Sequence, residues 1–177
     1  MAENSGMALI KSVRGHSPKY DSSCWFAENS TIVGEVDFGK NCTVWFNAVV
    51  RGDVNAIRIG DNVNIQDGVV IHCTYERAST SIGNNVSIGH NALIHGCTLK
   101  NNVLVGMGAI IMDHAVIHEN SIIAAGAVVL ENTVVPSGSI FAGIPARKVK
   151  DSAGKADEIT RIARNYPMYA KWFEEQP

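Results

Sequence analysis

The stretch 82–97 reads IGNNVSIGHNALIHGC, and an isoleucine opens a new unit every six residues, at Ile82, Ile88 and Ile94. Glycine, asparagine, histidine and other small or turn-forming residues follow each of these anchor residues. Most units also carry Val, Ala, Thr, Ser or Cys four positions after the anchor. Self-similarity at a fixed short period is typical of solenoid proteins, in which each unit adds one layer to the fold.

The same period extends over most of the chain. Upstream anchors are predicted at Val33, Phe38, Val44, Val50, Ile59, Ile65 and Ile71. Downstream, after a spacing of five to Leu99, they follow at Val105, Ile111, Ile117, Ile123, Val129 and Val135. Each unit is interpreted as one short strand and one corner, with the anchor pointing inward and Asn-rich pairs turning the backbone. A β-sandwich would instead give a period of two and irregular turns.

These units predict an all-β solenoid, specifically a parallel β-helix. They resemble hexapeptide-repeat proteins, and that resemblance implies three units per coil and a left-handed winding. Coils are expected to stack at the strand spacing of about 4.8 Å. The composition agrees, because Ile and Val total 37 of 177 residues against 5 Leu, which favours strands over a helical bundle.

Charge and cysteine content narrow the functional classes. The formal net charge is −2 without a basic cluster, which argues against nucleic acid and against electrostatic attachment to a membrane. No apolar run approaches the roughly 20 residues of a membrane span. The four cysteines form no C-x-x-C pair, and no signal peptide is recognisable at the start. We therefore expect a cytoplasmic protein with reduced thiols.

Two parts are predicted, a β-helix over residues 1–150 and a helical tail over residues 151–177. Residues 1–8 are expected to form a flexible extension. Pro167 should interrupt or kink the tail helix. The tail should pack on the β-helix or on a neighbouring subunit; a free amphipathic helix awaiting a partner is the alternative. Its apolar face is predicted to hold Ile159, Ile162, Ala163, Tyr166, Tyr169 and Phe173.

Two insertions interrupt the six-residue period. The spacing from Val50 to Ile59 is nine, and the spacing from Ile71 to Ile82 is eleven. Extra residues in a solenoid leave it at the corners, where function commonly resides.

The repeat register aligns two of the six histidines. His72 and His95 are each the second residue of their units, and those units are three apart, or one full coil. The pair should therefore stack on one face, near enough to share a metal. His90 is the third residue of its unit and lies on a different face, where Asp67 holds the same place one coil lower. For any one of these histidines, a solvated or hydrogen-bonded side chain is the alternative.

A metal on the His72–His95 pair could gain His90 from a neighbouring chain. Three imidazoles and one open position are typical of catalytic rather than structural zinc. Identical contacts that close a ring would then give a cyclic homotrimer with one metal at each interface.

Several motifs together are more specific than the repeats. They are RGD at 51–53, NIQD at 64–67, His72, and GHNALIHGC at 89–97. This combination resembles the γ-class carbonic anhydrases and their close relatives over residues 9–150. The resemblance implies that His72, His90 and His95 bind zinc, with His90 supplied by the adjacent subunit.

The resemblance also implies roles for five further residues. Gln66 would hydrogen-bond the zinc-bound solvent. Arg51 and Asp53 would form a charged pair that links adjacent subunits beside the metal, and a purely structural salt bridge is the alternative. Asn64 and Asp67 would support the metal ligands from behind, and corner-forming hydrogen bonds are the alternative for them.

The implied activity is the reversible hydration of CO2 to bicarbonate by metal-bound hydroxide. Zinc on three neutral imidazoles lowers the pKa of bound water to about 7, a value established for carbonic anhydrase itself. Fe2+ or Co2+ could occupy the same ligands. The acidic loop that shuttles protons in the most active members is reduced here to CTYERAST, residues 73–80, where Glu76 is the one acid. Slow turnover is therefore expected.

Two other functions use the same fold. One is a hexapeptide-repeat acyltransferase that uses acetyl-CoA, with a histidine as general base. The other is a non-enzymatic trimeric scaffold that binds a metal or a siderophore.

Overall fold

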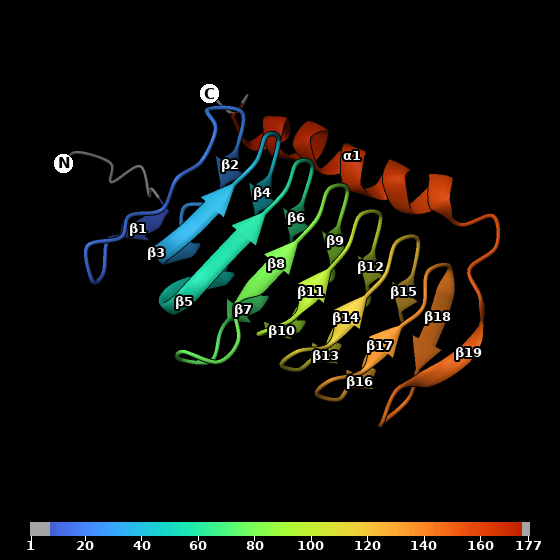
Figure 1. The fold of residues 1–177 in the computed structure, drawn as a ribbon. Helices are drawn as coiled ribbons and strands as arrows, with labels where there is room; N and C mark the ends of the chain where they lie inside the picture. Colours follow the sequence, from blue (N-terminus) through green and yellow to red (C-terminus); the bar gives the residue numbers. More distant parts are fainter. Residues whose placement is uncertain (1–7, 175–177) are drawn as a thin grey trace.

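Three short strands and three corners make each coil, and the coils stack into a triangular prism (Figure 1). The computed structural model describes residues 8–174 and shows a left-handed parallel β-helix followed by one helix. The expected extension at residues 1–8 lies, except for Ala8, outside the described residues.

Each face of the prism is a stack of parallel strands. The first face holds β1 (Leu9–Lys11), β7 (Val70–His72), β10 (Leu93–His95), β13 (Ile110–Ile111) and β16 (Val128–Val129). The second holds β8 (Thr80–Ile82), β11 (Thr98–Leu99), β14 (Val116–Ile117) and β17 (Val134–Val135). The third holds β2 (Trp25–Phe26), β4 (Thr43–Val44), β6 (Asn64–Ile65), β9 (Ser87–Ile88), β12 (Leu104–Val105), β15 (Ile122–Ile123) and β18 (Ser139–Ala142). Two longer strands bend from the first face onto the second, β3 (Thr31–Phe38) and β5 (Val49–Ile59).

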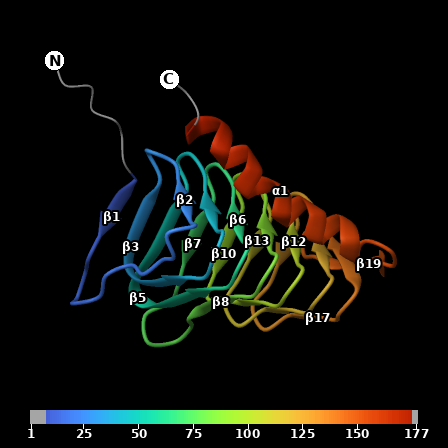
Figure 2. The same cartoon turned by 90° about the horizontal axis from the view of Figure 1, so that it is seen from above.

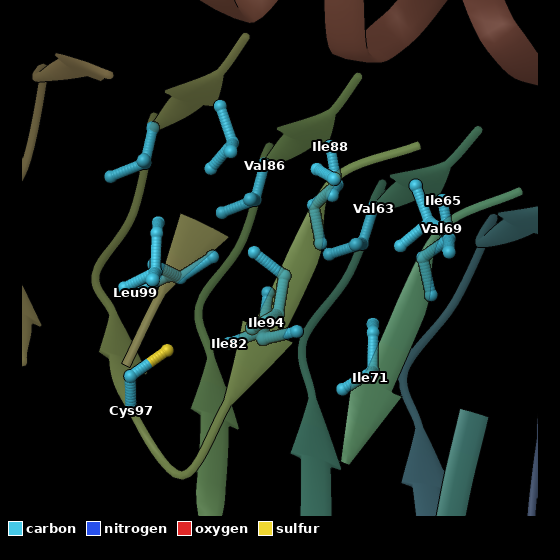
Figure 3. Close-up of a cluster of buried hydrophobic side chains, with 14 of the residues drawn as sticks. Val63, Ile65, Val69, Ile71, Ile82, Val86, Ile88, Ile94, Cys97 and Leu99 are labelled. Carbon is cyan, nitrogen blue, oxygen red and sulfur yellow. The ribbon is translucent and has the colours of Figure 1, made fainter. Parts of the chain in front are cut away.

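Anchor residues from successive coils lie directly over one another and form the core. Ile71 pairs with Ile94, and Ile94 pairs with Ile111. The predicted anchors from Phe38 to Val135 are all buried. Figure 3 shows a part of this core, in which the side chains of Ile65, Ile71, Ile82, Ile88, Ile94 and Leu99 point into the coils. Burying one such aliphatic side chain contributes about 1.5–3 kcal/mol, so the column of anchors is the main source of stability.

One predicted anchor is wrong. Ile32, not Val33, is fully buried and pairs with Val50. Successive side chains of a strand point to opposite faces, so Val33 points away from the core. The corrected anchor lies six residues before Phe38, which makes the first units more regular than the sequence suggested.

Asparagines turn one corner of five successive coils. Asn41, Asn62, Asn85, Asn102 and Asn120 all have positive φ, between 54° and 58°. Their side-chain amides form a ladder, in which each Nδ2 donates to the Oδ1 of the next coil at 3.1–3.3 Å. Asparagine is enriched at such left-handed positions because its short polar side chain bonds locally. The prediction that Asn-rich pairs turn the corners is confirmed.

Both insertions lie at corners of the first face. The extra residues of β5 shift its register against β3 and bring Asp53 to the outside. The second insertion leaves β7 after His72, and Thr74 and Ala78 close it with an antiparallel bridge. Both insertions therefore lie at the corner between the first and second faces, on successive coils next to His72.

The tail begins with β19 (Arg147–Asp151), which pairs antiparallel with β18, and continues as α1 (Ala156–Glu174). The helix runs back along the third face toward β2 (Figures 1 and 2). Ile159, Ala163 and Ala170 are the residues of this helix that are buried. The predicted interruption at Pro167 is wrong, because α1 runs through Pro167 as one helix. Within residues 8–174 no helix is long and apolar enough to cross a membrane.

The missing N–H of Pro167 costs the helix one backbone hydrogen bond. Aromatic packing on both sides of the proline holds the two turns against the same face. The ring of Trp45 lies 5.5 Å from that of Tyr166 and 5.7 Å from that of Phe173. Tertiary contacts therefore override the local preference to end the helix.

Candidate metal centre

His72 and His95 lie side by side on the first face. They are in-register partners of β7 and β10, which confirms the stacking predicted from the repeat. Their ring centroids are 5.2 Å apart, and Nδ1 of His72 lies 3.2 Å from Nε2 of His95. Both side chains are partly exposed, so the gap between the rings is open to solvent.

An aspartate holds the far nitrogen of each ring. Nε2 of His72 lies 3.0 Å from Oδ1 of Asp53, and Nδ1 of His95 lies 2.6 Å from Oδ1 of Asp113. Burial raises the pKa of Asp53, but hydrogen bonds from His72 and Arg51 outweigh that effect and lower it overall. Burial likewise raises the pKa of Asp113, and hydrogen bonds from Thr74 and His95 reverse the shift. Both carboxyl groups are therefore ionised at neutral pH.

The two carboxylates determine where the imidazole protons lie. A carboxylate has no hydrogen to donate, so Nε2 of His72 and Nδ1 of His95 must be the donors. Burial lowers the pKa of His72 more than the bond to Asp53 raises it, so this ring is neutral at pH 7. In the tautomers that these two carboxylates select, Nδ1 of His72 and Nε2 of His95 carry no hydrogen, so the two nitrogens that face each other across 3.2 Å are both acceptors.

A divalent cation satisfies two facing lone pairs. In a tetrahedral zinc site with Zn–N bonds of about 2.0–2.1 Å, two ligand nitrogens lie about 3.3 Å apart. The observed 3.2 Å matches that spacing. Histidine ligands of metals also usually donate their other nitrogen to a carboxylate or carbonyl. The donor set of His72 and His95 therefore fits a metal such as zinc.

Arg51 lies at the lower end of this column. The ladder that pairs Val50 with Ile71 places it one coil below His72, as the sequence predicted. Its guanidinium forms an ion pair with Asp53, which in turn bonds His72. The structure thus brings Arg51 and Asp53 together next to the candidate ligands.

His90 lies elsewhere in the same chain. It follows β9 on the third face, above Asp67, and its Nδ1 is 2.8 Å from Oδ2 of Asp67. This pair repeats the arrangement of the other two histidines, with one nitrogen on a carboxylate and Nε2 left available. Within the described part of the chain, no three His, Cys, Asp or Glu side chains converge into a group that could hold a metal.

Gln66 and Asn64 form a buried chain of amides beneath His90. Nε2 of Gln66 donates to Oδ1 of Asn64 at 3.0 Å, and Nδ2 of Asn64 donates to Oγ of Ser87 at 2.7 Å. Gln66 is 6% exposed and lines a hollow of about 410 Å³ together with His90 and Tyr166. The sequence predictions thus fall into two groups within one chain, one around His72 and His95 and the other around His90 and Gln66.

Sequence reasoning missed Asp113, Ser87 and Tyr166. Asp113 stands two positions after the anchor Ile111, and the same register that paired the histidines places it beside Gly96. The repeat could therefore have identified it. Tyr166 belongs to α1, whose placement on the β-helix no repeat register gives. Glu76, at the tip of the second insertion, is exposed and has a positive φ of 53°.

Comparison with known proteins identifies the family. A carbonic anhydrase of Geobacillus kaustophilus is 37% identical to this chain, and the match covers 94% of this chain and 91% of that protein. Gamma carbonic anhydrase 2, mitochondrial, of Arabidopsis thaliana is 38% identical over 89% of this chain. The chain belongs to the γ-carbonic anhydrase family. Named carbonic anhydrases among its relatives imply a metal cofactor for the family.

Other matches of this γ-carbonic anhydrase homologue reflect its repeats. The family described as bacterial transferase hexapeptide (six repeats) matches residues 96–131, and the hexapeptide repeat of succinyl-transferase matches residues 79–112. A solved hexapeptide transferase family protein from Anaplasma phagocytophilum is 38% identical with a TM-score of 0.89, covering 93% of this chain and 98% of that one. The chain spans about three fifths of the length of the Arabidopsis relatives that it matches.

Proposed function

We propose that this chain is a metal-dependent carbonic anhydrase that interconverts CO2 and bicarbonate at sites shared between the chains of a homotrimer. The observation that carries the proposal is the His72–His95 pair. Two imidazole nitrogens face each other as acceptors at 3.2 Å, while a carboxylate binds the opposite nitrogen of each ring. Membership of the γ-carbonic anhydrase family supports the same activity.

His90 of a second copy would supply the third ligand. Its Nε2 is available and its side chain is 43% exposed. Asp67 orients it as Asp53 and Asp113 orient the other two histidines. The face that carries His72 and His95 also displays an outward column of aliphatic side chains. Their register puts one on each coil, at Val49, Val70, Leu93, Ile110 and Val128. A second chain against this column would bury it, and a ring of three chains would leave no such face uncovered.

A zinc ion on three neutral imidazoles supplies a Lewis acid that activates water near neutral pH, and Fe2+ or Co2+ could take the same ligands. Gln66 would orient the reacting water. Because its Nε2 already donates to Asn64, its Oε1 faces the water as a hydrogen-bond acceptor and would orient it without taking its proton. Ser87 keeps Asn64 in the required orientation. Arg51 would neutralise Asp53 beside the site and favour the bicarbonate anion.

Proton export would be the slow step. Glu76 is exposed at the tip of the short second insertion and is the one carboxyl group of that segment. A carboxylate at a loop tip can exchange protons with buffer, but one group on a short loop offers a poorer relay than an acidic loop. We therefore propose turnover that rises with buffer concentration.

Acyl transfer from acetyl-CoA is the second candidate. It is favoured by the likeness to a hexapeptide transferase family protein and by the hollow beside His90. In that case His90 would act as a general base, with Asp67 holding its Nδ1–H. The carbonic anhydrase reading explains the facing lone pairs of His72 and His95, which acyl transfer does not use.

CO2 hydration measured by stopped flow on zinc-loaded and on iron-loaded protein tests the proposal. We expect activity that disappears with chelator, about one metal per chain, and a trimer in solution. Metal bound without hydration in either form would support the scaffold or binding function instead. Saturable binding of acetyl-CoA by calorimetry would move the assignment to acyl transfer.

A further inference from the structure

Asp113 is the buried carboxylate that contacts His95, and no expectation from the sequence included it. It lies in the turn after β13 and is 7% exposed. Its Oδ1 accepts a hydrogen bond from Nδ1 of His95 at 2.6 Å, and its Oδ2 accepts one from the hydroxyl of Thr74. Both oxygens are therefore engaged, one by a candidate metal ligand and the other by the second insertion.

Gly96 provides the space for this carboxylate. A Cβ at this position would collide with Oδ1 of Asp113 and would lie 2.7 Å from Cβ of Ala78. Gly96 also has a φ of +55°, a conformation that side chains disfavour. The turn after β10, the turn after β13 and the inserted loop thus meet around one aspartate. Such a meeting of three segments fixes the carboxylate in position as well as in orientation.

We propose that Asp113 is the positioning residue that sets the tautomer of His95, so that the Nε2 lone pair faces Nδ1 of His72. This inference rests on the proposed metal centre. By accepting the Nδ1 proton, the carboxylate keeps Nε2 as an acceptor and makes the imidazole a stronger donor to a cation. Asp53 holds His72 in the corresponding way from the opposite side of the pair.

Two substitutions separate charge from tautomer. In Asp113→Asn, the amide oxygen can still accept from His95 while the Thr74 hydroxyl accepts from the amide NH2, so the hydrogen bonds and the fold are kept but the negative charge is lost. In Asp113→Leu, a side chain of similar size offers no acceptor, and His95 is free to adopt the Nε2–H form. Glu119→Gln is the matched control, since Glu119 faces the exposed His118 at 3.7 Å, away from the site.

The tautomer is measured in the metal-free protein by two-dimensional ¹H–¹⁵N correlation of the histidine side chains. His95 should be Nδ1-protonated in the wild type, in Asp113→Asn and in Glu119→Gln, and should shift toward the Nε2–H form in Asp113→Leu. A His95 that remains Nδ1-protonated in Asp113→Leu would overturn the proposal. This measurement needs neither metal nor activity.

Zinc affinity is measured by competition with a chromophoric chelator, using zinc alone. Loss of a carboxylate behind a histidine ligand weakens metal binding about 10–100-fold, and we expect this range for Asp113→Asn and a larger loss for Asp113→Leu. Glu119→Gln should bind zinc as the wild type does. Equal affinities of wild type and both Asp113 variants would refute the positioning role even if CO2 is hydrated. A wild-type protein that binds zinc and loses affinity in the variants, yet hydrates no CO2, would instead refute the proposed function and leave this inference standing.

Discussion

A metal site shared between chains makes a quantitative prediction for mixed trimers. If His72 and His95 come from one chain and His90 from the next, then His90→Ala and His95→Ala should each abolish metal binding when alone. The two variants damage different sides of the interface, however. Where a His90→Ala chain supplies His72 and His95, and a His95→Ala chain supplies His90, the site is complete.

The geometry fixes the size of the recovery. Any trimer that contains both variants has three interfaces. At one of them a His90→Ala chain supplies His72 and His95 while a His95→Ala chain supplies His90, so one site in three is complete. Random assembly of equal amounts gives mixed trimers in about three quarters of cases, so about one quarter of all sites should be intact. A mixture of His72→Ala and His95→Ala should recover none, because both of these ligands come from the same chain in the stacked pair.

The assay is co-refolding of the two variants, one carrying an affinity tag, in the presence of zinc. Mass spectrometry of intact trimers measures the mixing, and elemental analysis and stopped-flow hydration measure the sites. Recovery near one quarter in the first mixture and background in the second would support the shared site. Mixed trimers of His90→Ala and His95→Ala that stay at background in zinc content would refute the division of ligands between chains.

Three further predictions concern the supporting structure. Gly96→Ala should lower zinc affinity by at least 10-fold and the free energy of unfolding by about 1–3 kcal/mol, because the new Cβ would collide with Asp113 and position 96 has a positive φ. Chelator competition measures the affinity, and chemical denaturation measures the stability. Asn85→Ala should lower the free energy of unfolding by about 1–2 kcal/mol, and Asn85→Gly should lower it by less. Both variants lose the side-chain hydrogen bonds of the asparagine ladder, but glycine accepts the φ of 55°. The denaturant midpoints of the two variants, measured side by side, test this order. The hydrogen bond from Arg58 lowers the pKa of Glu35, so its stabilising effect is present above the unfolded pKa of about 4.3 and is lost as the pH falls through the folded value. Glu35→Gln should therefore lower Tm at pH 7 but not at pH values below both pKa values, and an equal decrease at both would count against this account.

The repeat predicted most of the fold because one rule acts at every coil. Each anchor must be buried, so a six-residue period in the sequence becomes a column in space, and the pairing of His72 with His95 followed from it. Val33 was misplaced because Ile32 and Val33 are both β-branched, so residue type does not choose between them, although six residues back from Phe38 is Ile32.

Features outside the repeat could not be predicted from the six-residue period. The continuity of α1 through Pro167 depends on aromatic packing between the helix and Trp45, the residue after β4, which the periodicity of either element does not reveal. Asp113 was within reach of the register, but its importance depends on the room left by Gly96 and on the position of Thr74 in an insertion. Position in a column is thus predictable from sequence, whereas the contact between a column and an inserted loop is not.

The same regularity gives a geometric reason why the proposed site would take its third ligand from a second chain. Side chains from a straight column on a flat face approach a cation within one plane, whereas a tetrahedral metal needs ligands that surround it. Two adjacent coils supply His72 and His95 at the spacing of two tetrahedral ligands, and the next position of the column is occupied by Arg51. In the proposed trimer a further ligand would therefore come from outside the plane of the face, and His90, exposed and already oriented by Asp67, would meet that requirement from the face of a neighbouring chain.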